Sequence, residues 1–303
     1  MKRFVAWAPL IVAGCASIAP LPSDQQESVL AVPGHADFLA VDGRTVWTTN
    51  KGHVEQWSLQ GKMAEVDMTE PCGAMAVAAG SLWVADCKDG TLTRIDIKTA
   101  RKLAVISTGV GDTDGELNVV SGAGSVWLAS DPAGAVARVD PASNKVIATI
   151  RANPGSNYLT FGFGSLWAVS GAGQSLQQID PRANAVVRTT ALGLQPGFLT
   201  AGEGAVWVQE QGNGAVARID PSNGKITGRV KVGETLNYGD IDAGGGRVWL
   251  RTTQEQTFVV IDPKSMKVLA RVGKASGSGA LRYTPAGVWT TAHDNHTMSW
   301  WSR

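Results

Sequence analysis

The most restrictive feature of this sequence is a tryptophan that returns about every forty residues. The pattern Gly-x-(Val/Leu)-Trp, with small variations in the position of the glycine, places tryptophans at Trp47, Trp83, Trp127, Trp167, Trp207, Trp249 and Trp289. The intervals between them are 36, 44, 40, 40, 42 and 40 residues. A period of this length is typical of folds that repeat one supersecondary unit. The chain is therefore expected to build the same structural module seven times.

Each repeat contains short alternating apolar runs separated by turn residues. In the fifth repeat the runs GFLTA, AVWVQE, GAVARID and ITGRVKVG predict four strands, with the turn PSNGK before the last one. The sequence therefore predicts an all-β fold, a single seven-bladed β-propeller of four-stranded blades. The tryptophan is expected to fill the wedge between neighbouring blades.

An aspartate marks the end of the third strand in most repeats. It stands thirteen residues after the tryptophan at Asp96, Asp140, Asp180, Asp220 and Asp262. Because it precedes a turn and is usually followed by proline, its side chain is expected to cap that turn.

The last repeat predicts how the ring closes. Its runs GALRYT, GVWTTA and TMSWWS supply three strands and no fourth. The segment 27–34 (ESVLAVPG) has the composition of an outer strand and directly precedes the first inner strand. We expect residues 28–32 to complete blade seven, which would remove an exposed sheet edge. The propeller is then assigned to residues 27–303.

The N-terminus is predicted to be a targeting segment. A basic start (MKRF) and an apolar run too short to span a bilayer lead into Val-Ala-Gly-Cys, which fits a lipoprotein cleavage box. Residues 1–15 are interpreted as a lipoprotein signal peptide ending in a lipidated Cys15, and residues 16–26 as a flexible tether. An ordinary secretory signal cut near ASIAP is the alternative. Because Ala16 follows the cysteine, we expect a bacterial outer-membrane lipoprotein facing the periplasm, held by its lipid alone.

The overall charge argues against one class of partner. The formal net charge is +1, with 17% charged residues, so nothing favours nucleic-acid binding. We expect a monomer that binds a small molecule, a peptide or an envelope protein.

Two further cysteines, Cys72 and Cys87, bracket the predicted inner hairpin of blade two. A metal clip, a reactive thiol and a disulfide are the three interpretations. In an oxidising compartment a disulfide is favoured, and no further metal ligands are evident nearby. If the hairpin turns at residues 79 and 80, residue 72 faces residue 87, within disulfide range.

One rim of the propeller collects the unusual side chains. This rim is formed by the connections into each inner strand and those leaving each second strand. The candidate ligand-binding residues on it are Asp37, Asn50, Asn118, Asn157, Tyr158, Tyr238, Asp240 and Arg251. The candidate catalytic residues on it are His35, His53, Glu210, His293 and His296. Imidazoles beside carboxylates can act as bases or metal ligands near neutral pH, although histidines are also common in exposed loops.

The acidic stretch before the third inner strand is a separate candidate. Asp112, Asp114 and Glu116 could bind a cation, or could form a solvated acidic loop.

The unit PCGAMAVAAGSLWVADCKDGTLTRID resembles the bacterial extracytoplasmic propellers of the YVTN and streptogramin B lyase-like (virginiamycin B lyase-like) superfamily. The resemblance covers essentially the whole chain after the leader, and it implies the propeller fold. It also implies a magnesium-dependent elimination that opens a cyclic depsipeptide, with rim histidines and a glutamate. Calcium-dependent lactonases of similar shape imply a set such as Asn50, Asn118, Asn157, Glu210 and Asp240.

The family's Glu-x-His pair is absent, and its Trp-Phe-Thr-Glu phrase has one near match at residues 207–210. Two functions therefore remain. The first is a binding propeller. The second is a metal-assisted lyase or lactone-opening enzyme that uses rim histidines and glutamate, with Mg²⁺ or Ca²⁺ as the possible cofactor.

Overall fold

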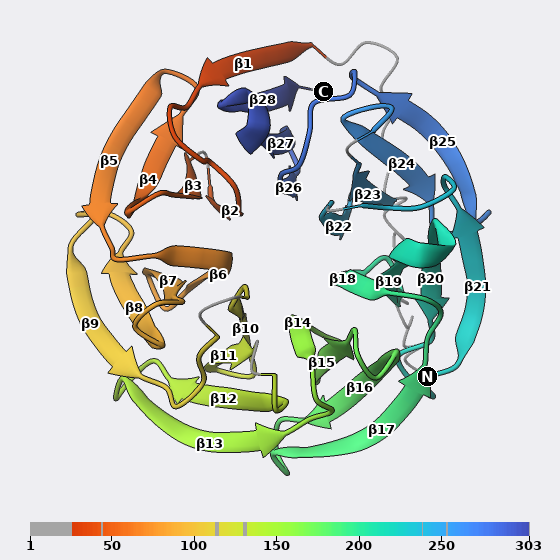
Figure 1. Ribbon diagram of the computed structural model, residues 1–303, viewed down its shortest axis with the longest axis horizontal. Helices are drawn as coiled ribbons and strands as arrows, with labels where there is room; N and C mark the ends of the chain where they lie inside the picture. Colours follow the sequence, from red (N-terminus) through yellow and green to blue (C-terminus); the bar gives the residue numbers. More distant parts are fainter. Residues whose placement is uncertain are drawn as a thin grey trace, which may run out of the picture.

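The computed structural model describes residues 26–43, 45–112, 115–129, 132–237, 239–252 and 254–302. These residues form seven four-stranded antiparallel sheets arranged as blades around a central axis (Figure 1). The predicted β-propeller is confirmed. The proposed signal peptide, Cys15 and nearly all of the tether lie outside the described residues. Among the residues described, no helix has the length and apolarity needed to cross a membrane.

Within each blade the strands follow one another from the centre of the ring outward. Blade one contains β2 (Leu39–Asp42), β3 (Thr45–Asn50), β4 (His53–Ser58) and β5 (Gly61–Asp67), and blade two contains β6 (Pro71–Ala78), β7 (Ser81–Asp86), β8 (Thr91–Asp96) and β9 (Lys102–Ser107). Blade three contains β10 (Asn118–Gly122), β11 (Ser125–Ala129), β12 (Ala135–Asp140) and β13 (Lys145–Arg151), and blade four contains β14 (Ser156–Gly162), β15 (Ser165–Ser170), β16 (Ser175–Asp180) and β17 (Ala185–Ala191). Blade five contains β18 (Pro196–Gly202), β19 (Ala205–Glu210), β20 (Ala215–Ile219) and β21 (Ile226–Lys231), and blade six contains β22 (Ile241–Gly244), β23 (Arg247–Arg251), β24 (Phe258–Asp262) and β25 (Lys267–Val272). Blade seven contains β26 (Leu281–Thr284), β27 (Gly287–Ala292), β28 (Thr297–Ser302) and β1 (Glu27–Ala31). Two 3-10 turns, η1 (Gln211–Asn213) and η2 (His293–Asn295), follow β19 and β27.

The repeated tryptophans pack between blades, as predicted. Each lies in an apolar cluster that joins its own blade to the next one; Trp83, for example, packs with Leu117 and Leu128 of blade three. All seven are at most 4% exposed. The indole nitrogen of Trp127 also donates a hydrogen bond of 3.0 Å to the Gly122 carbonyl, and four other repeats make the same bond. The repeat is thus the packing device that holds the ring.

Arginines on the third strands add polar links between blades. The Arg94 guanidinium lies over the Trp83 ring and donates to Pro141 and Asn144, in the turn after β12. Arg138 repeats the arrangement one blade later, over Trp127. These two arginines thus connect Trp83 and Trp127 to the outer turn of the following blade.

The repeated aspartates cap turns, as predicted. The Asp140 carboxylate accepts hydrogen bonds from the Ala142 amide and the Ser143 hydroxyl, at 3.1 and 2.6 Å. The five aspartates at this position all have pKa values below the ordinary value because such hydrogen bonds stabilise the carboxylate.

The ring closes through the N-terminal strand. β1 pairs antiparallel with β28 over its whole length, from Glu27 opposite Trp301 to Ala31 opposite Thr297. Figure 1 shows β1 outside β28, completing blade seven beside β5 of blade one. The predicted closure is therefore confirmed.

The disulfide between Cys72 and Cys87 is present, but the predicted register was wrong. Cys72 lies opposite Ala85, and the Cys87 amide donates instead to the Glu70 carbonyl. A bulge between residues 72 and 76 shifts the pairing by two residues. Gly73 sits in this bulge with φ of 69°, and a Cβ there would collide with the backbone of Leu117 in blade three. The glycine therefore allows the two blades to approach closely at the bulge, and the cysteine Cα atoms still lie 5.9 Å apart.

Candidate functional site

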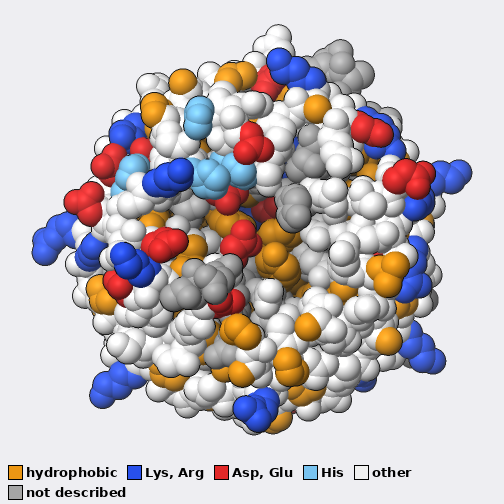
Figure 2. Space-filling model, in the orientation of Figure 1, with side chains coloured by type: hydrophobic (Ala, Val, Ile, Leu, Met, Phe, Trp, Pro, Cys, Tyr) orange, Lys and Arg blue, Asp and Glu red, His pale blue; other side chains and the backbone are white. Residues whose placement is uncertain are grey.

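A cavity of about 390 Å³ opens at the mouth of the central channel. We call it the mouth cavity, and its principal lining residues are His35, Asp37, Phe38, Glu116, Tyr158, Phe198, Asp240, His293 and Asp294. They come from six blades, at the starts of inner strands and in the turn after β27. This is the rim predicted from the sequence. Figure 2 shows histidine and acidic side chains gathered beside the hollow at the centre of the ring, with apolar side chains inside it.

Two histidines meet where blade one adjoins blade seven. The ring centroids of His35 and His293 are 4.1 Å apart. His35 Nε2 lies 4.0 Å from Asp37 Oδ2, and His293 Nδ1 lies 3.1 Å from Asp294 Oδ1. Burial lowers the pKa of both histidines, and each is therefore neutral at pH 7.

Carboxylates give the mouth cavity its negative character. The pKa of Asp37 is raised to about 7, first by burial and then by the neighbouring carboxylates of Glu116 and Asp240. Burial also raises the pKa of Glu116, whose Oε2 atom is buried without a hydrogen-bond partner among the described residues. The Arg251 guanidinium partly offsets the effect on Asp37.

Aromatic rings form the opposite wall. The Tyr158 and Phe198 rings are in tilted contact, with 4.2 Å between centroids, and the Phe38 ring centroid lies 6.4 Å from that of Phe198. Burial raises the pKa of the Tyr158 hydroxyl, so that group stays protonated. The mouth cavity therefore offers an apolar surface facing a row of acidic groups.

A second cavity, of about 250 Å³, continues into the channel and shares Tyr158, Phe198 and Asp240 with the first. Here Arg282 forms an ion pair with Asp240, which also accepts hydrogen bonds from the Leu281 and Ile241 amides. The Arg282 guanidinium is thus neutralised by Asp240, a carboxylate of the channel itself.

Three of the predicted ligand-binding residues are occupied in holding the scaffold. The Asn50 side chain accepts from the His35 amide at 2.6 Å and donates to the Pro33 carbonyl at 2.8 Å, so it fixes the loop that carries His35. Asn118 accepts from the Leu159 amide of the next blade. Arg251 is buried and donates to backbone carbonyls, including that of Thr291.

Other predicted residues lie away from the mouth cavity. Glu210 is buried at the end of β19 in blade five, where Arg229 on β21 pairs with it through two hydrogen bonds of 2.6 and 2.9 Å. His53 contacts Glu55 and Glu65 on the hairpin of β4 and β5.

Of the remaining candidates, His296 lies in a left-handed turn and its Nδ1 is 2.6 Å from the Gly34 carbonyl oxygen. Asn157 is not among the described residues that line the two channel cavities. Tyr238 and Asp114 lie outside the described residues, so their expected roles stay predictions.

Phe38 and Phe198 were not among the candidates predicted from the sequence. Both stand at the inner-strand position that also carries Tyr158 in blade four, so aligning the repeats on their tryptophans could have revealed them. Phe38 is nine residues before Trp47, as Tyr158 and Phe198 are before Trp167 and Trp207.

His35, Asp37 and His293 together form a possible metal-ligand set, with one ligand atom each and all within 4.8 Å of one another. Two imidazole nitrogens and one carboxylate oxygen are typical of zinc and related transition metals. Magnesium and calcium prefer oxygen ligands throughout. The set therefore does not fit the Mg²⁺ or Ca²⁺ that the family resemblance implies.

Solved structures with the same fold include two lyases. The virginiamycin B lyase of Staphylococcus aureus superimposes with a TM-score of 0.78 at 16% identity, over 92% of this chain and all of that one. A streptogramin B lyase structure superimposes with a TM-score of 0.76 at 15% identity, over 92% of this chain and 97% of that one. The chain shares the fold of these lyases.

The same architecture occurs in a solved structure that is not described as a lyase. Kuenenia stuttgartiensis hydrazine synthase superimposes with a TM-score of 0.73 at 15% identity, over 90% of this chain and 96% of that one. The sequence matches no protein-family model and no curated protein. The likeness thus concerns the seven-bladed architecture, which supports more than one activity.

Proposed function

We propose that this protein is a lipid-anchored propeller of the bacterial cell envelope, facing the periplasm, that binds a small ligand in its mouth cavity. The observation that carries the proposal is the convergence of side chains from six blades on one concave site of about 390 Å³. Small-molecule sites are concave, largely apolar and supplied with a few polar groups, at about this size. The leader sequence supports the location, and the near-neutral net charge of +1 argues against nucleic acid.

The lining indicates the chemistry of the ligand. The rings of Phe198 and Tyr158 suit a flat or aliphatic body, because they bury apolar surface without needing hydrogen bonds. Asp37 and Glu116 suit a group that donates hydrogen bonds or carries positive charge. A small organic molecule with an apolar part and a donor group fits both walls.

A cavity-filling variant tests this function. Phe198→Trp places a larger ring in the mouth cavity, whereas Leu59→Trp adds the same ring at a residue that is 44% exposed. A mixed library of neutral, anionic and cationic small molecules is screened by ligand-observed NMR. We expect binding to the wild type and to Leu59→Trp, and its loss in Phe198→Trp. Hits that bind all three proteins equally would refute a mouth-cavity site.

A second candidate function is a lyase or lactone-opening activity. The neutral imidazoles of His35 and His293 favour it, because they border a cavity large enough for a small ring and can accept a proton at pH 7. Incubation with a cyclic depsipeptide and a set of simple lactones tests the idea by mass spectrometry. An enzyme would show turnover in the wild type and none in His293→Ala. A lack of turnover in the wild type would refute the enzymatic candidate and leave ligand binding as the remaining function.

A further inference from the structure

We propose that His35, Asp37 and His293 bind one zinc-class transition-metal ion at the mouth of the channel. His35 Nε2 and Asp37 Oδ2 are 4.0 Å apart, and the His35 and His293 rings are in contact at 4.1 Å. All three ligand atoms lie within 4.8 Å of one another. Small side-chain rotations bring such a set around a single ion, whose bonds to nitrogen and oxygen are about 2.0–2.2 Å long.

Hydrogen bonds to the backbone of each ligand's segment already hold the three ligands in place. Asn50 fixes the His35 loop through hydrogen bonds to the His35 amide and the Pro33 carbonyl. The Asp37 carbonyl accepts from the Thr291 hydroxyl of blade seven at 2.5 Å. The His293 amide donates to Ser278. The site thus spans the junction where blade seven meets blade one, and the closure of the ring assembles it.

The donor set selects the metal. Imidazole nitrogens suit zinc, copper, nickel and iron, whereas magnesium and calcium are bound mainly by oxygen. Three protein ligands with an open fourth position are typical of zinc sites that bind a further molecule. Here the fourth position borders the mouth cavity, because all three ligands line it.

The chain contains an internal comparison at His53, Glu55 and Glu65. These residues also group within 4.8 Å, but the Lys62 ammonium lies 3.2 Å from Glu55 and 2.7 Å from Glu65. A cation of the protein itself therefore compensates these carboxylates. At the mouth of the channel, Asp37 forms no hydrogen bond or ion pair with a lysine or arginine among the described residues, and the Arg251 guanidinium acts on it only through space. This difference separates the proposed metal site from the control cluster.

The test is a titration of the purified, chelator-treated protein with Zn²⁺, followed by calorimetry and native mass spectrometry. We expect one Zn²⁺ per chain, with no competition from millimolar Mg²⁺ or Ca²⁺. His35→Ala and His293→Ala should each weaken zinc binding by more than about 10-fold, because loss of even an outer-shell partner of a metal ligand costs about 10–100-fold in affinity. His53→Ala should leave the affinity unchanged, because His53 belongs to the control cluster, and circular dichroism checks that each variant is folded.

Cobalt gives an independent readout. A Co²⁺ ion bound by His35, Asp37 and His293 should produce visible absorption bands that disappear in His293→Ala. Absent zinc binding, equal binding by the His293 variant, or a preference for Mg²⁺ would each overturn the proposal. The proposed ligand-binding function would survive that result if the small-molecule hits still bind the metal-free wild type and not Phe198→Trp.

Discussion

The aspartates that end the third strands show how one residue type sets a repeated turn. Asp140 accepts a 2.6 Å hydrogen bond from Ser143, and its pKa is lowered because the folded turn stabilises the ionised form. A lowered pKa in the folded state stabilises the fold above the ordinary value near 3.8. That contribution is lost as the pH falls through the folded pKa.

Asp140→Asn is therefore expected to lower the melting temperature at pH 7 and to have a smaller effect at pH 3. Asn keeps one acceptor oxygen but loses the charge that strengthens these bonds. Asp42→Asn is the matched control, since the Asp42 carboxylate makes no hydrogen bond among the described residues. Differential scanning calorimetry at the two pH values measures the effect. Equal losses at both values would show that the charge is unimportant.

At the level of single residues, the sequence predicted the rim but not the direction of each side chain. His35, Asp37, Tyr158, Asp240 and His293 do converge on the mouth cavity. Other candidates on the same rim do not, because their side chains are bound to partners elsewhere in their own or neighbouring blades. Glu210 on β19 is paired with Arg229 on the outer strand β21. Arg251 on β23 donates to the Thr291 carbonyl of the next blade. Such pairings follow from packing between strands, which no local pattern encodes.

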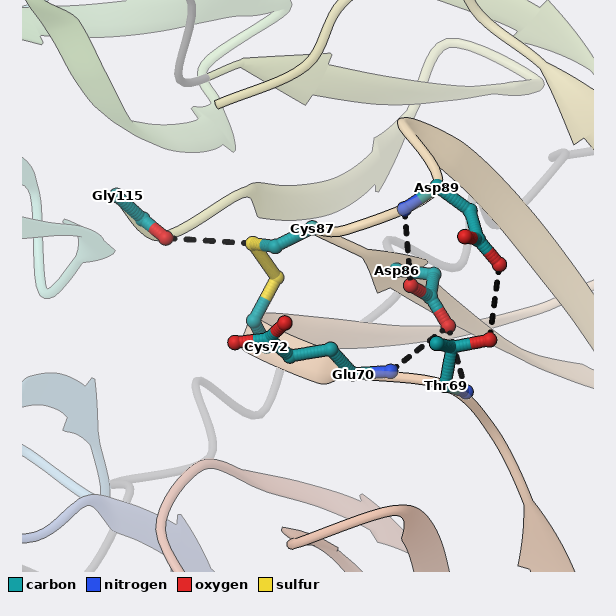
Figure 3. The surroundings of a disulfide bond; sticks show 7 residues. All are labelled: Thr69, Glu70, Cys72, Asp86, Cys87, Asp89 and Gly115. Atoms are coloured by element: carbon teal, nitrogen blue, oxygen red, sulfur yellow. Dashed lines mark hydrogen bonds between the residues drawn. A yellow bond between two sulfur atoms is a disulfide. The ribbon is translucent and has the colours of Figure 1, made fainter. Parts of the chain in front are cut away.

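The hairpin of β6 and β7 illustrates the same limit at the level of an element. Cysteine spacing and repeat position, together with the oxidising compartment expected from the leader, predicted the disulfide. The register was not predictable, because the bulge lies where Gly73 meets the backbone of Leu117 in the next blade, a contact between segments far apart in the sequence. Figure 3 shows that the Cys87 sulfur faces the Gly115 carbonyl oxygen, 3.3 Å away, immediately before Glu116. The disulfide therefore lies against the loop that brings Glu116 to the mouth cavity.

Replacing both cysteines, Cys72→Ser with Cys87→Ser, is expected to reduce the free energy of unfolding by about 3 kcal/mol. Opening a loop of 15 residues returns conformational entropy of this size to the unfolded chain. Urea unfolding of the oxidised wild type, the reduced wild type and the double variant measures the change. The reduced wild type should match the variant, and coincident midpoints for the oxidised and reduced proteins would contradict a stabilising role.

Across the whole molecule, the regular tryptophan period made the number of blades predictable. Each tryptophan reports a contact between consecutive blades, and such contacts are close in sequence in every pair except one. The exception joins blade seven to blade one, where Trp289 packs with Leu39 and Val46. This junction depends on β1, which pairs with β28 and precedes the first blade.

A chain that begins at Pro33 should therefore be much less stable than one that begins at Gln26. Without β1, the edge of β28 is exposed and Leu30 no longer packs beside Met298 and Trp300 in the junction between blades seven and one. We expect a lower melting temperature and concentration-dependent self-association, measured by calorimetry and analytical ultracentrifugation.

The same truncation should also weaken zinc binding, because His35 and His293 lie on opposite sides of this junction. A substitution that only lowers stability, Val126→Ala in the buried core between blades two and three, serves as the control. It should lower the melting temperature while leaving the zinc affinity of the folded protein unchanged. Equal zinc affinity in the truncated chain would separate the metal site from the closure of the ring.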